Sequence, residues 1–256
     1  MKNANNIWGV VAAAGVGARM GGDFDRPKQY LPLGARRVID HALLALCERR
    51  AVSGVVVGIR DGDRWWRAQP FAHAKLLAVS RGGESRARTV LNALRRLLKP
   101  DGPAAAGDWV LVHDAARPCV AARDIERLIA AARAHGHGAA LALPVTDALK
   151  RVSDGIIEAA VDNGDYWRAV TPQMFRCGAL AEALQDGIDA GRAPADEAAA
   201  MACAGVHAAA VPGHPANLKI TVAADLELAT RYLSCRAGAE TETETETETA
   251  RGRRSA

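Results

Sequence analysis

Apolar runs of strand length alternate with segments of helical periodicity along most of the chain. Residues 7–14 form a continuous apolar run that ends in a glycine-rich stretch, and residues 37–50 then place apolar side chains on one helix face. Further strands are predicted at 54–59, 76–79 and 109–112, and further helices at 86–98 and 125–133. Because the strands are apolar throughout rather than alternating, both faces of the sheet should be covered. The pattern predicts an α/β fold with a doubly wound, mostly parallel sheet, which binds its ligand at the carboxyl ends of the strands.

Residues 144–174 interrupt this alternation. They contain two short β-like pieces at 149–152 and 156–161, separated by a Ser-Asp-Gly turn, and they end with Thr-Pro-Gln at 171–173. We expect an extended β-hairpin that leaves the sheet as an arm, a kind of projection that commonly serves dimerisation. After the arm, the alternation resumes with helices predicted at 180–190, 196–204 and 223–232 and strands at 208–211 and 218–221.

The length of 256 residues suits one domain, which we place at residues 1–235. Residues 236–256 contain a Glu-Thr repeat followed by Arg-Gly-Arg-Arg, with hardly an apolar residue to bury. We expect this tail to be disordered and of low complexity.

Composition narrows the class of ligand that the protein could bind. The net charge is +4, from 33 basic and 29 acidic residues, but aromatic residues make up only 4% of the chain. Few aromatic rings and scattered basic residues argue against a nucleic-acid partner and favour a small anionic ligand. No apolar run approaches the roughly 20 residues that a membrane helix needs.

Cysteine usage and the N-terminal sequence indicate a cytoplasmic protein. The five cysteines are odd in number and contain no Cys-x-x-Cys pair, so neither a disulfide framework nor structural zinc is supported. The first residues show no small-residue cleavage pattern, so we expect no signal peptide.

The strongest local feature is the glycine-rich stretch 12–22 after the first strand. Glycines there let backbone N–H groups approach phosphate oxygens, but the spacing matches neither a Walker A loop nor a dinucleotide fingerprint. Arg19 inside the loop and Lys28 just after it are two cations suited to phosphoryl or nucleotidyl transfer. The plainer alternative is a tight strand–helix turn with solvated charges.

Three other motifs could contribute to a site. In His113-Asp-Ala-Ala-Arg117, Asp114 ends a strand where a metal–triphosphate complex would lie, or it simply caps a helix and pairs with Arg117. In the stretch 82–89, Glu84 and Thr89 could meet the polar edge of a base, or Glu84 and Ser85 could cap the following helix. Lys219, in the predicted strand 218–221, either points into the site or extends to solvent.

Taken together, the motifs resemble a known family. Ala-Ala-Gly-x-Gly-x-Arg-Met, Pro-Lys-Gln-Tyr-Leu, Gly-Gly-x-x-Arg, Val-His-Asp-Ala-Ala-Arg-Pro, Thr-Pro-Gln-Met-Phe, Asp-Glu-Ala and Asn-x-Lys-Ile-Thr occur in this order. Their order resembles that of the 2-C-methyl-D-erythritol 4-phosphate cytidylyltransferases of the non-mevalonate isoprenoid pathway, over about residues 7–233. The resemblance implies a Rossmann-like nucleotidyltransferase fold, a homodimer joined through the arms, and Mg²⁺ as cofactor.

The resemblance also implies residue roles. Arg19, Lys28 and Lys219 would stabilise the transfer of a cytidylyl group from CTP to the methylerythritol phosphate, while pyrophosphate leaves. Contacts to the nucleotide would come from Ala13, Ala14, Gly15, Gly17, Gly83, Glu84, Thr89, Asp114 and Ala115. Of these, Asp114 would also ligate Mg²⁺. The sugar phosphate would be held by Arg117, Thr171, Lys219 and, in the arm, Asn163.

Three departures from the family pattern lie on the acceptor side. Ala148 replaces a threonine, Asn163 replaces an arm arginine that reaches the partner's substrate, and Ala216 replaces an acidic residue. These departures leave two alternatives to methylerythritol phosphate transfer. One is a cytidylyltransferase for another polyol phosphate, such as ribitol 5-phosphate, and the other is a CTP-binding paralogue with little turnover.

Overall fold

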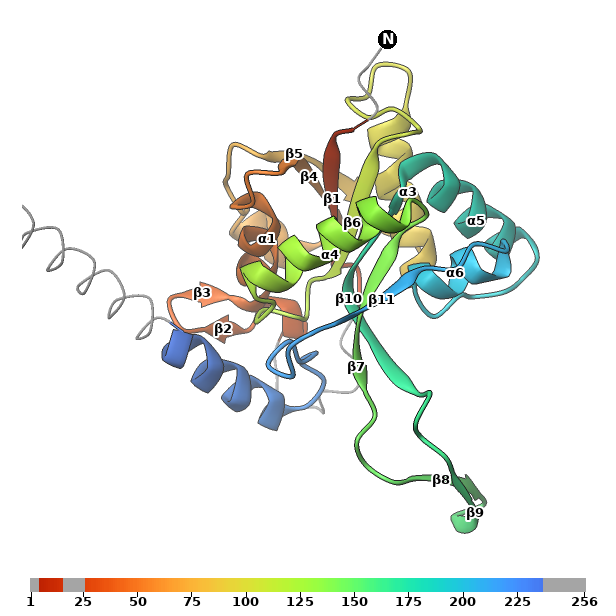
Figure 1. Cartoon of the computed structure of the whole chain (residues 1–256). Coiled ribbons are helices and arrows are strands. Elements are labelled where there is room, and N and C mark those ends of the chain that lie inside the picture. The colour runs from red at the N-terminus through yellow and green to blue at the C-terminus, as the bar shows by residue number, and fades with distance from the viewer. Residues whose placement is uncertain (1–4, 16–25, 237–256) are drawn as a thin grey trace, which may run out of the picture.

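A central seven-stranded sheet organises the molecule (Figure 1). The computed structural model describes residues 5–15 and 26–236. The strands are β1 (Ile7–Ala12), β4 (Val52–Ile59), β5 (Leu76–Arg81), β6 (Trp109–Asp114), β7 (Ala139–Pro144), β10 (Trp167–Arg176) and β11 (Ala209–Pro212). Their order is β11-β7-β10-β6-β1-β4-β5. Only β10 runs antiparallel to its neighbours in this sheet, so the predicted α/β fold with a mostly parallel sheet is confirmed.

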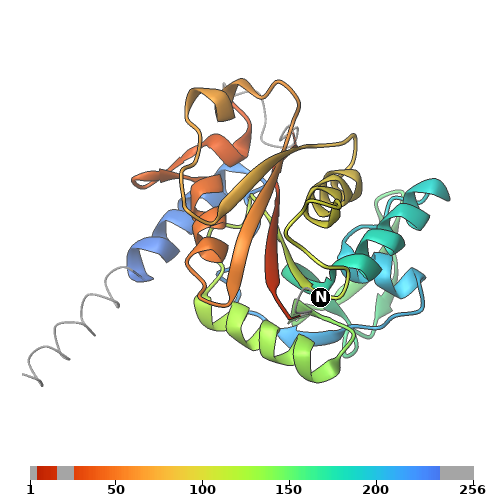
Figure 2. The same ribbon diagram turned by 90° about the horizontal axis from the view of Figure 1, so that it is seen from above.

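Helices cover both faces of the sheet (Figure 2). One face carries α1 (Val38–Cys47) and α4 (Ala122–His135), and the other carries α3 (Arg86–Leu98), α5 (Cys177–Asp189) and α6 (Glu197–Cys203). In β1, Ile7 and Val11 belong to the core on the first face, whereas Trp8 and Val10 belong to the core on the second. The continuous apolar run at residues 7–14 predicted that both faces of the sheet are covered, and the packing of β1 confirms this.

The arm leaves the sheet between β7 and β10 (Figure 1). It ends in a two-stranded antiparallel hairpin formed by β8 (Leu149–Ser153) and β9 (Ile156–Val161). The central sheet resumes where Trp167 pairs with Pro144, so Thr171-Pro172-Gln173 lies in β10 and not in the arm. Thr171-Pro172-Gln173 belongs to the sheet because β10 is long: it pairs with β7 from Trp167 onward and with β6 from Gln173 to Arg176.

The expected strand at residues 218–221 is wrong. These residues have no regular structure, and their backbone is held by single hydrogen bonds such as Ile220 N–H to the Ala116 carbonyl, 2.8 Å. The predicted helix that follows is present over residues 223–236. Alternating apolar residues suit a strand and an extended loop equally, and no strand within residues 5–15 and 26–236 lies alongside to form a ladder.

The structure adds four small elements that were not predicted: the 3₁₀ turn η2 (Lys28–Tyr30), the hairpin strands β2 (Pro32–Leu33) and β3 (Arg36–Arg37), and the short helix α2 (Arg64–Ala68). Within the described residues, no helix is long and apolar enough to cross a membrane. Residues 237–256 of the predicted tail lie outside the described part.

Candidate active site

A cavity of about 550 Å³ opens at the carboxyl ends of the central parallel strands. Its walls are formed by Ala12, Ala13, Ala14, Gly15, Lys28, Gln29, Arg60, Gly83, Glu84, Ser85, Arg86, Thr89, Asp114, Ala115, Ala116 and Lys219. The volume suits a small-molecule ligand. Its position is the one predicted for a doubly wound sheet.

The loop after β1 is fixed at its base by a buried glutamine. Gln29 in η2 donates hydrogen bonds from Nε2 to the carbonyls of Ala13 (2.9 Å) and Gly15 (2.8 Å). The same turn places Lys28 in the cavity wall. The sequence motif contains Gln29, but residue type alone gave no reason to assign it this role. Gly17 and Arg19 lie outside the described residues.

The wall formed by β5 and α3 is shaped by backbone. A Cβ on Gly82 would lie 2.3 Å from the Ala14 Cβ and 2.9 Å from the Ile59 carbonyl oxygen, so the β5 exit packs directly on the β1 exit. The Gly83 N–H donates to Thr89 Oγ1, 3.0 Å, and that hydroxyl donates to the Ser85 carbonyl, 3.0 Å. Thr89 therefore orients the turn as well as lining the cavity.

The structure distinguishes the two roles considered for Glu84 and Ser85, helix capping and ligand contact. Ser85 is the N-cap of α3, because its Oγ accepts a hydrogen bond from the Arg88 N–H at 3.1 Å. Glu84 does not cap the helix, and its side chain is 83% exposed at the cavity rim. Its carboxylate is therefore available to a ligand.

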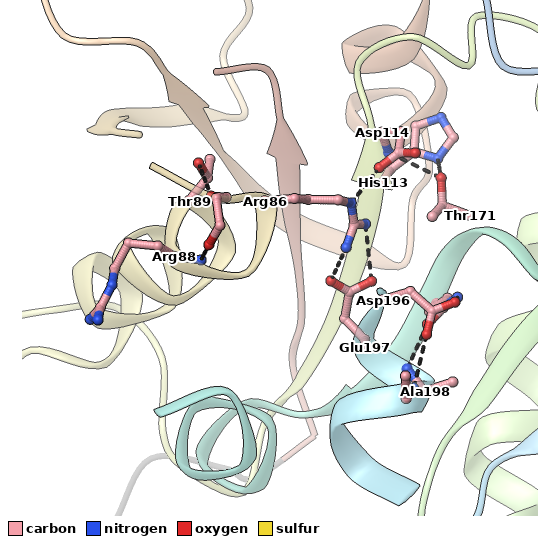
Figure 3. A network of polar contacts seen from close by, with 12 residues as sticks. Arg86, Arg88, Thr89, His113, Asp114, Thr171, Asp196, Glu197 and Ala198 are labelled. Atoms are coloured by element: carbon pink, nitrogen blue, oxygen red, sulfur yellow. Dashed lines mark hydrogen bonds and ion pairs between the residues drawn. The ribbon is translucent and has the colours of Figure 1, made fainter. Parts of the chain in front are cut away.

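A charged network centred on Asp114 lines the cavity at the end of β6 (Figure 3). Arg86 Nε donates to Asp114 Oδ1 at 2.7 Å. Lys219 Nζ donates to Asp114 Oδ2 at 2.8 Å. The other end of the Arg86 guanidinium forms two bonds to the fully buried carboxylate of Glu197, at 2.6 and 3.1 Å. Arg86 thus joins two carboxylates that come from β6 and α6.

This network determines which groups are charged. Burial would raise the pKa of Asp114, but Arg86 and Lys219 hold that pKa well below its ordinary value, so the carboxylate is ionised. Burial would lower the pKa of Arg86, but Glu197 and Asp114 raise it above its ordinary value. Burial raises the pKa of Glu197, and Arg86 opposes that shift.

Behind Asp114, a buried histidine connects β6 to β10. The Thr171 hydroxyl accepts the Asp114 N–H at 3.0 Å and lies 3.0 Å from His113 Nδ1, while His113 Nε2 lies 3.0 Å from the Arg117 carbonyl. A carbonyl only accepts, so Nε2 bears the proton and Nδ1 accepts from Thr171. Burial lowers the pKa of His113 to about 4, which agrees with a neutral ring. His113 thereby fixes the turn that follows Asp114.

Glu197 is positioned by the N-terminus of α6. Gln173 Oε1 accepts the Ala198 N–H at 2.8 Å, and its Nε2 donates to Asp196 Oδ2 at 3.1 Å. Asp196 in turn caps α6 by accepting the Ala199 N–H. Neither Arg86 nor Glu197 was predicted as a site residue, although both belong to quoted motifs, because their partners lie far away in the sequence.

Lys219 reaches Asp114 from an irregular segment. Buried Asn217 donates from Nδ2 to the Thr171 carbonyl, 2.8 Å, and its own carbonyl accepts from Arg117 Nη1, also 2.8 Å. Arg117 Nε is buried 3.7 Å from Asp114 Oδ2 and makes no hydrogen bond with the described residues. Burial lowers the pKa of Arg117.

The structure therefore brings most of the predicted residues together. Ten of them line the cavity: Ala13, Ala14, Gly15, Lys28, Gly83, Glu84, Thr89, Asp114, Ala115 and Lys219. Arg117 and Thr171 contact Asp114 from behind the wall. Asn163 lies in the arm instead, where its Nδ2 donates to the carbonyls of Val145 (3.0 Å) and Asp147 (2.9 Å).

The donor set fits magnesium. Each Asp114 oxygen accepts one hydrogen bond and keeps a further lone pair, and Mg²⁺ is commonly held by one or two carboxylates together with substrate phosphates. In the described ranges, no cluster of three or more His, Cys, Asp or Glu side chains could hold an ion without a substrate.

A doubly wound sheet with a glycine-rich loop, an ionised aspartate and several cations around one cavity defines a nucleotidyltransferase. The family model described as 2-C-methyl-D-erythritol 4-phosphate cytidylyltransferase matches residues 7–235. The chain belongs to this family.

Relatives and solved structures agree with this assignment. The chain is 43% identical to the cytidylyltransferase of Vibrio atlanticus over 90% of this chain and 96% of the relative, and 45% identical to that of Pseudomonas aeruginosa over 86% and 93%. A crystal structure of 4-diphosphocytidyl-2C-methyl-D-erythritol synthase superposes with a TM-score of 0.75 at 34% identity, covering 89% of this chain and 99% of that one. The Francisella tularensis cytidylyltransferase gives a TM-score of 0.74 at 30% identity, with the same coverage.

Proposed function

We propose that this cavity transfers a cytidylyl group from CTP to 2-C-methyl-D-erythritol 4-phosphate, which gives 4-diphosphocytidyl-2C-methyl-D-erythritol and pyrophosphate. The observation that supports this best is that one cavity brings glycine-containing backbone and a charged network together. Backbone at Ala14, Gly15 and Gly83 lines one part of it, and Asp114, held by Arg86 and Lys219, lines another.

The chemical step needs no protein nucleophile. A phosphate oxygen of the acceptor attacks the α-phosphorus of CTP, the new P–O bond forms, and the bond to the bridging oxygen of pyrophosphate breaks. Negative charge grows on the α-phosphate oxygens and on the leaving group, so fixed cations lower the barrier. Lys28 and Lys219, which line the cavity, and Arg19 of the glycine-rich sequence 12–22 would provide this charge stabilisation.

Asp114 would orient the reactants in two ways. Its ionised carboxylate holds the Lys219 ammonium in place. It would also ligate Mg²⁺ together with phosphate oxygens, and the ion would neutralise part of the triphosphate charge.

The acceptor would lie beside Arg117, Thr171 and Lys219, with Asn163 contributing from an arm. We further propose a homodimer joined through the arms, supported by the exposed apolar side chains of Val152, Ile156 and Ile157 on the hairpin. A cytoplasmic location is part of the same proposal, and the five cysteines, all described, form no disulfide.

Pyrophosphate release tests this function directly. The protein is given CTP and Mg²⁺ with methylerythritol phosphate or with ribitol 5-phosphate as acceptor. Robust release with the first acceptor alone is expected. Release with ribitol 5-phosphate instead would reassign the acceptor, and CTP binding without release for either would indicate the paralogue with little turnover.

A further inference from the structure

Among the described residues, the arginines Arg60 and Arg86 line the cavity, and the family resemblance gives neither a role. Arg60 directly follows β4 and lines the wall. Its side chain is exposed, and its guanidinium makes no hydrogen bond or ion pair with the described residues. Only its backbone is engaged, since its carbonyl accepts the Asp63 N–H at 3.2 Å.

Two other cations that line the same cavity are already paired with carboxylates. Arg86 is bonded to the carboxylates of Asp114 and Glu197, and Lys219 is bonded to Asp114. Their charge is largely compensated by these carboxylates. Arg60 differs because it presents an uncompensated cation with five N–H donors to the cavity.

The sheet determines which part of a nucleotide Arg60 can reach. β4 lies between β1 and β5, and its end is hydrogen-bonded to both neighbours. The Ala13 N–H donates to the Gly58 carbonyl at 2.8 Å, and the Gly82 N–H donates to the Ile59 carbonyl at 2.6 Å. Arg60 therefore emerges between the β1 loop and the Gly83 turn.

Asp114 lies further along the same edge. It ends β6, which is two strand spacings from β4, or roughly 10 Å. The α-phosphate must lie near Asp114 for the reaction, so the nucleotide extends from there towards Glu84 and Thr89 on the β5 side. Arg60 then flanks the base and ribose rather than the transferring phosphate.

We infer that Arg60 binds the base–ribose part of the nucleotide. Cytosine O2 and the ribose hydroxyls are acceptors for its planar fork, and the guanidinium can also stack on the base. Glu84, on the neighbouring rim, is placed to accept from the exocyclic amine. The identity of the nucleotide as CTP rests on the proposed function.

The test compares Arg60→Gln with Arg67→Gln, which removes the same charge from an exposed position outside the cavity. Calorimetry measures the affinities for CTP, CMP and pyrophosphate. Arg60→Gln is expected to weaken CTP and CMP by the same factor, about tenfold, and to leave pyrophosphate unchanged. Arg67→Gln should alter none of the three affinities.

Steady-state kinetics adds a second measurement. Loss of a base–ribose contact should raise the KM for CTP, with little change in kcat. Unchanged CTP and CMP affinities in Arg60→Gln would overturn the inference. So would a loss confined to CTP and pyrophosphate, since that pattern indicates a phosphate contact.

Failure of the proposed function would look different. If the unsubstituted protein binds CTP but releases no pyrophosphate, the transferase proposal is wrong. The CTP and CMP affinities of Arg60→Gln would still decide the role of Arg60. An unsubstituted protein that binds neither CTP nor CMP overturns both.

Discussion

The two walls of the cavity are built by different means. The wall at the ends of β1 and β5 is made by backbone contacts and by side chains close in sequence, such as Thr89 to Gly83, six residues apart. The wall around Asp114 is made by ion pairs to Arg86, 28 residues away, and to Lys219, 105 residues away. Arg86 also connects that wall to Glu197, which lies 111 residues after Arg86 in the sequence.

This difference determines how each wall should fail. The backbone wall depends on close approach, so added atoms should damage it. The charged wall depends on mutual neutralisation, so removal of one partner leaves another buried and uncompensated.

The largest effect is expected where cations act on the transferring phosphate. Lys28→Ala and Arg19→Ala should each lower kcat by about 100- to 1,000-fold, because charge stabilisation in the transition state is lost. CTP should still bind, as calorimetry can show. Lys99→Ala, which removes a half-buried lysine outside the cavity, is the matched control. Near-normal kcat in either variant would contradict the assigned role.

Truncation in the charged wall should give the largest loss of stability. Glu197→Ala leaves the buried end of Arg86 without its carboxylate and should cost about 3–5 kcal/mol in the free energy of unfolding, measured with urea. Glu84→Gln, at an exposed carboxylate, should cost less than about 1 kcal/mol. Similar losses in the two variants would show that the network does not stabilise the fold.

The backbone wall is challenged by one added methyl group. Gly82→Ala would force its Cβ against Ala14 and the Ile59 carbonyl, which should cost about 1–3 kcal/mol of stability. The KM for CTP should rise as the β1 loop is displaced. Gly164→Ala, where the nearest atom is 3.5 Å from the new Cβ, should leave both quantities nearly unchanged. Equal behaviour of the two variants would refute the close-approach argument.

The smallest effect is expected in the arm. Asn163→Ala removes two hydrogen bonds to the carbonyls of Val145 and Asp147, at a cost of about 1 kcal/mol in the free energy of unfolding. If Asn163 also contributes to acceptor binding, the KM for methylerythritol phosphate should rise severalfold while the KM for CTP does not. An unchanged acceptor KM would limit Asn163 to bracing the arm.

Much of the architecture could be predicted because its causes are local. Apolar runs buried on both faces identified the strands, and helical spacing identified α3 from Arg86 to Leu98 with the observed bounds. The loop carrying Lys219 was misassigned for an equally local reason. Leu218, Lys219 and Ile220 alternate in a loop as they would in a strand, and only the absence of a pairing partner in the sheet decides between them.

For the site, too, some features could be predicted from the sequence and others depended on contacts between distant segments. Residue types and motif order were enough to predict that Asp114, Lys28 and Lys219 belong to one site, and all three line the cavity. The metal role of Asp114 stays a prediction. Tertiary structure alone decided that Arg86 joins Asp114 to Glu197, that Gln173 orients α6, and that Arg60 enters the cavity without a carboxylate partner among the described residues. A sequence specifies which charges exist, but their compensation depends on distances of a few ångströms between segments that only folding brings together.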